Sequence, residues 1–225
     1  MVTVSDLFQL HPVARRLRLE FDRERLLSDL SKVDESWWGV HEGPYHDGAW
    51  EAVALWAPRG DRTEQRSFGG DFAATEALDR CTYMADVIAA VPGEKNRVRL
   101  MRLRPGGHIR RHSDPMHTIA ESLVRLHVPV RTNDHVRFLV NDQRVVMGAG
   151  ELWHVDVRFP HEVENAGATA RVHLVIDALR NPALDTMLER ADVVGTGSLR
   201  EYFLGDLSSR TREGANDVTR TRLHE

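Results

Sequence analysis

Two stretches, LVRLHVPV at residues 123–130 and ARVHLVID at residues 170–177, share one alternation of aliphatic and polar side chains. Successive side chains of a β-strand point to opposite faces of its sheet, so each stretch predicts a strand with one aliphatic face. The opposite faces carry a repeated Arg-x-His pair: Arg125 and His127 in the first strand, Arg171 and His173 in the second. Such a face can simply meet solvent in an antiparallel sheet. Two matching faces indicate instead a polar, ligand-binding barrel interior.

Further short strands are predicted around these two, separated by turn signals such as Pro105-Gly106-Gly107 and Thr132-Asn133-Asp134. The predicted strands cover residues 50–57, 97–104, 123–130, 135–140, 144–147, 151–157, 161–165 and 170–177. Many short strands at this spacing predict an antiparallel sandwich, barrel or jelly roll.

Helices are predicted on both sides of this β-rich region. Asp22 is the expected N-cap of a short helix whose apolar face includes Leu26 and Leu30, and a second helix is expected over about 75–90. No linker or repeat divides the chain, which predicts a single domain. Its parts are a helix/strand N-terminal part (1–95), a jelly-roll core (about 97–178) and a helical C-terminal extension (179–225).

The composition of the 225 residues narrows the function classes. A net charge of −4 argues against a nucleic-acid partner. No apolar run approaches the roughly 20 residues that span a bilayer, and the N-terminal residues lack a signal-peptide pattern. The single cysteine, Cys81, can form no internal disulfide. We therefore expect a cytoplasmic protein that binds neither nucleic acid nor membrane. Its oligomeric state stays open.

Histidine is concentrated in one region: of 12 in the chain, eight lie between residues 108 and 173. His112-Ser113-Asp114 is an H-x-D triplet, and in an extended segment its imidazole and carboxylate share a face. His161, 49 residues later, is the candidate third ligand. Two histidines and one carboxylate on one face of an octahedron form the facial triad of non-heme Fe(II) oxygenases.

A second H-x-D triplet, His154-Val155-Asp156, competes with the first. It lies only seven residues before His161 and would crowd all three ligands into one hairpin. The spacing therefore favours His112 and Asp114.

The region from Met101 to Asp177 resembles the aspartyl/asparaginyl beta-hydroxylase family of Fe(II)/2-oxoglutarate-dependent dioxygenases. The motifs occur in the family's order and spacing: LRPGGHIRRHSD (103–114), RLHVPVRTND (125–134), GELWHVDVRFPHEVENAG (150–167) and RVHLVID (171–177), with GAWEAVALW (48–56) matching more loosely. The resemblance implies a mainly β fold with flanking helices around a double-stranded β-helix, a cupin-like jelly roll.

The resemblance also implies a ligand set and a reaction. Iron would be held by His112, Asp114 and His161, the distal carboxylate of 2-oxoglutarate by Arg171, and further co-substrate contacts would come from Arg125 and His127. With O2, such an enzyme hydroxylates an aliphatic carbon, here expected to be a beta carbon, and releases succinate and CO2. The substrate would be an amino acid, or an Asp/Asn-like residue in a peptide or carrier-bound molecule. The presence of Asp114 favours hydroxylation over halogenation.

Two alternatives remain open. One is a cupin-type metalloenzyme that does not use 2-oxoglutarate, although such a site typically needs an H-x-H motif and a downstream Glu. The other is a non-catalytic jelly-roll metal-binding protein, although such modules usually lose ligands that are all present here.

The substrate contacts are also open. The candidates are the rings clustered in the N-terminal part: Trp37, Trp38, His41, Tyr45 and Trp50. Trp38 and Trp50 could equally anchor this segment on the core. Three arginines, Arg102, Arg104 and Arg111, could meet an acidic substrate, but structural ion pairs are the more common role of such residues.

Overall fold

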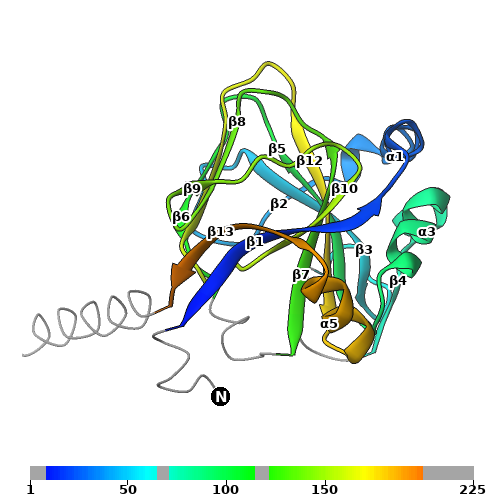
Figure 1. Ribbon diagram of the computed structural model, residues 1–225. Coiled ribbons are helices and arrows are strands. Elements are labelled where there is room, and N and C mark those ends of the chain that lie inside the picture. The colour runs from blue at the N-terminus through cyan, green and yellow to red at the C-terminus, as the bar shows by residue number, and fades with distance from the viewer. Residues whose placement is uncertain (1–8, 65–70, 115–121, 200–225) are drawn as a thin grey trace, which may run out of the picture.

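The computed structural model describes residues 9–64, 71–114 and 122–199. Its strands form two sheets (Figure 1). The strands are β1 (Leu10–Glu20), β2 (Gly39–Val40), β3 (Trp50–Pro58), β4 (Phe72–Ala74), β5 (Lys95–Leu103), β6 (His108–His112), β7 (Leu123–Arg131), β8 (Val136–Val140), β9 (Gln143–Arg144), β10 (Glu151–Val155), β11 (His161–Asn165), β12 (Arg171–Leu179) and β13 (Asp192–Ser198).

The larger sheet has the strand order β13-β1-β10-β7-β12-β5-β3-β2, with β4 paired to β3. The smaller sheet has the order β6-β11-β8-β9. Neighbouring strands in both sheets are antiparallel. This two-sheet jelly roll with flanking helices confirms the predicted fold class.

The helices are α1 (Arg23–Leu30), a 3-10 turn (Glu35–Trp37), α2 (Glu76–Arg80), α3 (Thr82–Ala90) and α5 (Pro182–Glu189). Asp22 caps α1 as predicted, since its carboxylate accepts hydrogen bonds from the Glu24 and Arg25 backbone N–H groups at 2.9 and 3.1 Å. The single helix predicted over 75–90 is two helices, because the backbone of Cys81 leaves the helical region (φ −106°, ψ 63°). No helix in the described ranges is long and apolar enough to cross a membrane.

The helices cover the outer face of the larger sheet, and in Figure 1 α1, α3 and α5 lie on the side away from β6, β8 and β9. The alternation in β7 and β12 explains this arrangement. Their aliphatic residues pack against the helices: Val124, Leu126, Val128, Val130, Val172, Leu174 and Ile176. Each such buried side chain stabilises the fold by roughly 1.5–3 kcal/mol. The Arg-x-His faces consequently point toward the smaller sheet, where a second apolar cluster includes Leu103, Phe138 and Val163.

Three parts of the chain differ from the prediction. The extension after residue 179 is not helical throughout, because α5 is followed by β13, which pairs with β1 at the end of the larger sheet. Residues 200–225 lie outside the described residues. Strand β1 was not predicted. The strand predicted at 144–147 is wrong beyond Arg144, where the short β9 ends.

Candidate iron and co-substrate site

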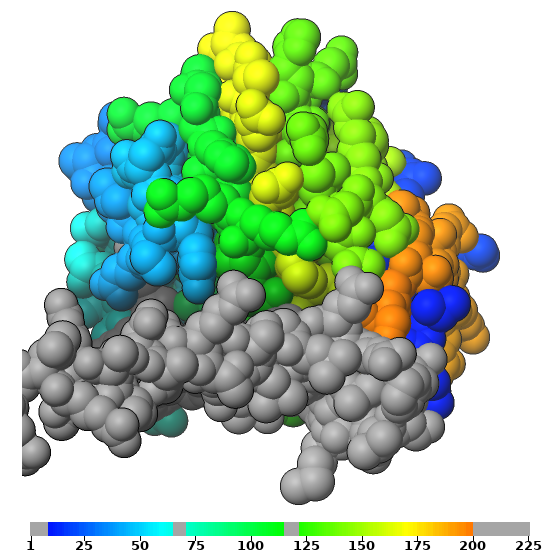
Figure 2. Space-filling view, turned by 90° about the vertical axis from the view of Figure 1, so that its left-hand side faces the viewer, coloured from blue at the N-terminus to red at the C-terminus, as the bar shows by residue number. Residues whose placement is uncertain are grey.

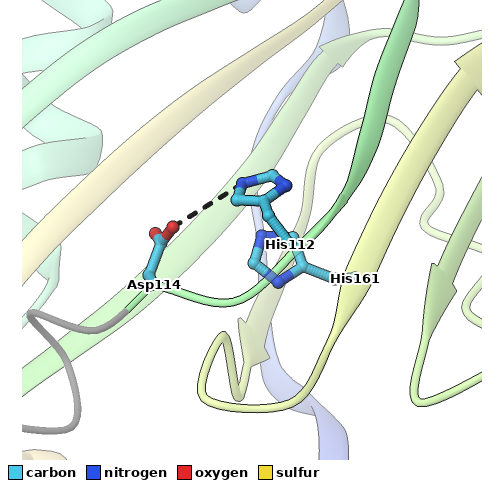
Figure 3. A group of neighbouring side chains, drawn as sticks. All are labelled: His112, Asp114 and His161. Carbon is cyan, nitrogen blue, oxygen red and sulfur yellow. Dashed lines mark ion pairs between the residues drawn. The ribbon is translucent and has the colours of Figure 1, made fainter. Parts of the chain in front are cut away.

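Three potential metal ligands meet where the ends of β6 and β11 lie side by side. His112 ends β6, Asp114 follows two residues later, and His161 begins β11 opposite His112. One ligand atom from each residue lies within 4.8 Å of the others, and His112 Nε2 is 3.6 Å from Asp114 Oδ1. Figure 3 shows the Asp114 carboxylate directed toward the His112 ring, with the His161 ring next to it. The residues predicted from spacing are thus adjacent.

Both histidines are oriented for coordination through Nε2. The His112 Nδ1–H donates to the Arg110 carbonyl at 2.7 Å, and the His161 Nδ1–H donates to the Phe159 carbonyl at 3.0 Å. A hydrogen bond of this kind fixes the tautomer of a metal-binding imidazole. Burial lowers the pKa of His161 to about 4, which keeps its ring neutral, as a ligand must be. Two imidazoles and one carboxylate fit Fe(II).

Arg125 connects Asp114 to an acidic residue that the sequence did not single out. Its Nη1 donates to Asp114 Oδ2, while its Nε and Nη2 donate to the two oxygens of Asp177 at 2.7 and 3.0 Å. Asp177 also accepts from Arg97 Nη2 at 3.1 Å. Burial opposes the charge of Arg125, but the carboxylates of Asp177 and Asp114 outweigh it and raise the pKa. Arg125 therefore holds the carboxylate of the candidate iron ligand.

A second cationic group lies deeper between the sheets. Arg171 is 3% exposed, its Nη2 donates to His173 Nδ1 at 2.8 Å, and its guanidinium lies 5.6 Å from the centroid of the Phe138 ring. Its Nε has no hydrogen-bond partner among the described residues, nor do the two ring nitrogens of His127. Burial lowers the pKa of Arg171 to about 9, so it is still protonated at neutral pH. These unsatisfied buried groups fit a carboxylate ligand.

Part of the N-terminal aromatic cluster lines this site. Tyr45 stacks on His112 at 4.3 Å between ring centroids, and the Trp50 centroid is 6.4 Å from that of His112. The Arg110 backbone N–H donates to the Tyr45 carbonyl at 2.7 Å. Figure 2 shows the light-blue segment that includes residues 40–50 against the green segment of β6. By contrast, Trp37 and Trp38 pack against the cluster under the helices.

Other sequence candidates have structural partners instead. Arg102 and Arg104 both pair with Glu51, and Arg111 pairs with Asp142. In the competing triplet, the Asp156 carboxylate accepts from Arg158 Nε and Nη2 at 2.8 and 2.6 Å.

Comparison with known proteins identifies the class. The aspartyl/asparaginyl beta-hydroxylase family matches residues 20–181, and the chain belongs to this family. This confirms the resemblance seen in the sequence and supports the predicted enzyme class, a dioxygenase of the hydroxylase type.

Two known proteins can be placed beside the chain. The L-proline cis-4-hydroxylase of Rhizobium meliloti (strain 1021) is 28% identical over 168 residues, which are 71% of this chain and 58% of that protein. The chain thus spans little more than half the length of this curated relative. A crystal structure of an oxidoreductase of the 2OG-Fe(II) oxygenase family from Burkholderia pseudomallei superposes with a TM-score of 0.51 at 14% identity, covering 70% of this chain and 78% of that one. That similarity supports the fold.

Proposed function

We propose that this protein is an Fe(II)/2-oxoglutarate-dependent hydroxylase that acts on an aliphatic carbon of an amino acid. The observation that carries the proposal is the triad at the ends of β6 and β11, in which both Nδ1 atoms are hydrogen-bonded to carbonyls and the Nε2 atoms are left for a metal. Arg171 supplies the second half of the argument: its Nε is buried without a partner among the described residues, and its guanidinium lies 5.6 Å from the Phe138 ring, whose centroid is 6.5 Å from that of His161.

His112, Asp114 and His161 would hold the iron. Asp114 has two functional oxygens: Oδ1 faces His112, and Oδ2 accepts from Arg125. The arginine therefore restricts the carboxylate to one orientation, which is the usual role of a hydrogen-bond partner behind a metal ligand.

Arg171 would bind the distal carboxylate of 2-oxoglutarate. A guanidinium can hold a carboxylate through two parallel hydrogen bonds, and in a buried site such charge-assisted bonds are strong. His127, with both ring nitrogens unsatisfied, is placed on the same inner face as Arg171 and would contact the same co-substrate. Burial and the neighbouring Arg171 lower the pKa of His127, so its ring is neutral and offers one donor and one acceptor.

Bound iron with 2-oxoglutarate would supply the oxidation of a C–H bond by O2, with succinate and CO2 as co-products. The protein's part is to orient and shield the reactants. Tyr45 and Trp50 beside His112 would exclude water from one side of the centre.

The relative's name makes free L-proline the first substrate to test. Because the family's name refers to aspartyl and asparaginyl residues, Asp and Asn, both free and within peptides or on carriers, are the next.

The test measures succinate and a product 16 Da heavier than the substrate, by mass spectrometry, over a panel of free amino acids and short peptides. We expect both from the native protein and neither from the His112→Ala variant. His108→Ala is the matched control, since His108 lies on the same strand with a 48% exposed side chain. Undiminished turnover by the His112→Ala variant would refute the assignment.

Anaerobic addition of Fe(II) and 2-oxoglutarate provides a readout other than activity. Chelation of the metal by the keto acid should produce a weak visible absorption band, which the His112→Ala variant should lack. Turnover that requires metal but no 2-oxoglutarate would favour a cupin-type metalloenzyme. Metal binding with no turnover and no band would favour a binding protein.

A further inference from the structure

Arg99, on β5, is a buried cation whose charge no carboxylate of the described residues neutralises by direct contact. It is 2% exposed, and its one assigned hydrogen bond joins Nη1 to His41 Nε2 at 3.1 Å. Its Nε is buried and has no hydrogen-bond partner within residues 9–64, 71–114 and 122–199. A guanidinium carries five N–H donors and no acceptor, and burying it unpaired is costly. A buried guanidinium without a carboxylate partner is suited to bind an anion from solution.

The charges around Arg99 increase the cost of leaving its guanidinium without an anionic partner. On the inner face of the larger sheet, Asp177 lies opposite Arg97 in the register of β5 and opposite Arg125 in the register of β7. Both of these arginines use Asp177, and Arg125 also uses Asp114. Arg97 and Arg125 thus use both carboxylates, and Arg99 has no carboxylate within direct contact among the described residues. Burial and then the charges of Arg97 and Arg125 lower the pKa of Arg99.

Arg99 lies at a different place on the inner face from Arg171, to which the distal carboxylate of 2-oxoglutarate is assigned above. Arg171 lies opposite Leu103 on β5, four residues from Arg99, which is roughly 13 Å along the strand. The carbon chain of 2-oxoglutarate has four carbon–carbon bonds and spans no more than about 6 Å. The neighbours of the two arginines also differ: Arg171 contacts His173 and the Phe138 ring, whereas Arg99 contacts His41.

Two ring contacts lead from Arg99 toward the metal ligand His112. The His41 ring, which contacts Arg99, stacks on Trp50 at 3.8 Å between centroids and an interplanar angle of 21°. Trp50 in turn lies 6.4 Å from His112. Burial and the nearby Arg99 lower the pKa of His41 to about 2, so its ring is neutral and can accept a hydrogen bond from the guanidinium. Its Nδ1 is a further buried polar atom without a partner in the part of the chain that the structure describes.

We propose that Arg99, supported by His41, binds a carboxylate of the substrate and thereby directs the substrate's carbon chain toward the metal ligands. This inference rests on the proposed function and deepens it, because it defines the substrate as an amino acid or peptide residue with a free carboxylate. The carboxylate can come from two sources: the α-carboxylate of a free amino acid, or the side chain of an Asp residue within a peptide.

The experiment measures substrate binding and turnover separately. Protein loaded with Fe(II) and 2-oxoglutarate is titrated under argon, in a calorimeter, with free L-proline and L-aspartate, with L-prolinamide and the diamide of aspartic acid, which keep no carboxylate, and with an N-acetylated, C-amidated tripeptide that has Asp at its centre. Aerobic KM values are then measured for whichever probes turn over. We expect at least one acid to bind, and loss of its carboxylate to weaken binding by roughly 100-fold, since charge-assisted hydrogen bonds are lost.

The Arg99→Met variant should bind the acid as weakly as the native protein binds the amide, and Arg99→Lys should fall between them. The dissociation constant for 2-oxoglutarate, read from the visible band, should stay within twofold in both variants. The Arg99→Met variant should also unfold at a higher temperature than the native protein without substrate, because an unpaired buried charge has been removed. Arg102→Met is the matched control, since Arg102 lies on the same strand but pairs with Glu35 and Glu51. It should leave substrate affinity unchanged.

The outcomes separate the two proposals. A native protein that forms no band with 2-oxoglutarate contradicts the proposed function. If the band forms but acids and amides bind equally, or the Arg99 variants weaken 2-oxoglutarate binding instead, the Arg99 assignment is wrong and the proposed function stands. Preferential binding of the tripeptide supports Arg99 as a carboxylate site for an Asp side chain, and preferential binding of a free acid supports the α-carboxylate.

Discussion

Replacing Asp177 with Asn should weaken both the fold and iron binding. The side chain of Asp177 is 2% exposed and accepts hydrogen bonds from Arg125 at 2.7 and 3.0 Å and from Arg97 at 3.1 Å. Asparagine keeps the shape but removes the charge that two buried guanidiniums share. Breaking a buried ion pair by removing one partner costs about 3–5 kcal/mol. For a protein of this size, the midpoint of thermal unfolding should fall by roughly 6–20 °C.

The same substitution should also lower the affinity for iron, because Arg125 connects Asp177 to Asp114. Asparagine has one acceptor oxygen in place of two, so the guanidinium loses at least one of the two hydrogen bonds that hold it against Asp114. Loss of a partner behind a metal ligand typically lowers metal affinity by 10- to 100-fold. The assay is an anaerobic Fe(II) titration with a competing chelator, accompanied by a thermal melt.

Asp156→Asn provides the matched control. Its carboxylate is also buried (7% exposed) and also paired with an arginine, but that arginine is Arg158, at 2.6 Å, whereas Asp177 pairs with Arg125, the arginine that holds Asp114. We expect a lower melting temperature with unchanged iron affinity. If Asp177→Asn binds iron as tightly as the control does, the idea that Arg125 and Asp177 position the iron carboxylate must be abandoned.

Three further outcomes are expected. Burial lowers the pKa of His154 from 6.5 to about 4, so the unfolded chain binds this proton more readily and stability falls as pH drops through that window. In urea melts, His154→Gln should reduce this loss by up to roughly 1.4 kcal/mol per pH unit, and an unchanged slope would contradict it. Gly150→Ala should cost about 2 kcal/mol or more, because φ is +86° and a Cβ would lie 2.3 Å from the Phe21 carbonyl oxygen. In the same thermal melts, Gly48→Ala, with φ +95° and open space, should cost less. Burial raises the pKa of the Cys81 thiol to about 11, so a thiol reagent should label it only in the unfolded protein, and stoichiometric labelling of the native protein would contradict this.

The sequence was most informative where the signal is local. The two-residue alternation in 123–130 and 170–177 is a property of each strand alone, and the structure places its aliphatic residues under the helices. The cap at Asp22 is local as well. Strand β1 was not predicted because its residues, with Pro12 and several arginines, form a strand only through pairing with the distant β10 and β13. Val145 and Val146 have strand propensity, but β9 ends before them.

In the candidate site, too, the residues with a local sequence signal were predicted and those that depend on distant strands were not. The triad residues are marked by their types and spacing, and the structure brings them together. Asp177 and Arg99 were not singled out, because their importance depends on which residues face them from other strands. One signal was available: charged residues such as Arg97, Arg99 and Asp177 alternate with aliphatic ones within predicted inner strands, where a charge needs a partner or a ligand.

Strands β7 and β12 each line the candidate site with one face and pack against the helices with the other, which restricts how their sequences can change. Odd-numbered positions such as Arg125 and Arg171 serve the site, and even-numbered positions such as Leu126 and Val172 hold the helices. Inserting or deleting one residue within either strand would exchange the two sets, placing guanidiniums among leucines and leucines beside the candidate iron ligands. Natural or laboratory evolution of these strands must therefore proceed by substitution at fixed length. Changes in length are confined to the connections between strands, and libraries aimed at new substrates should vary length there and side-chain identity within the strands.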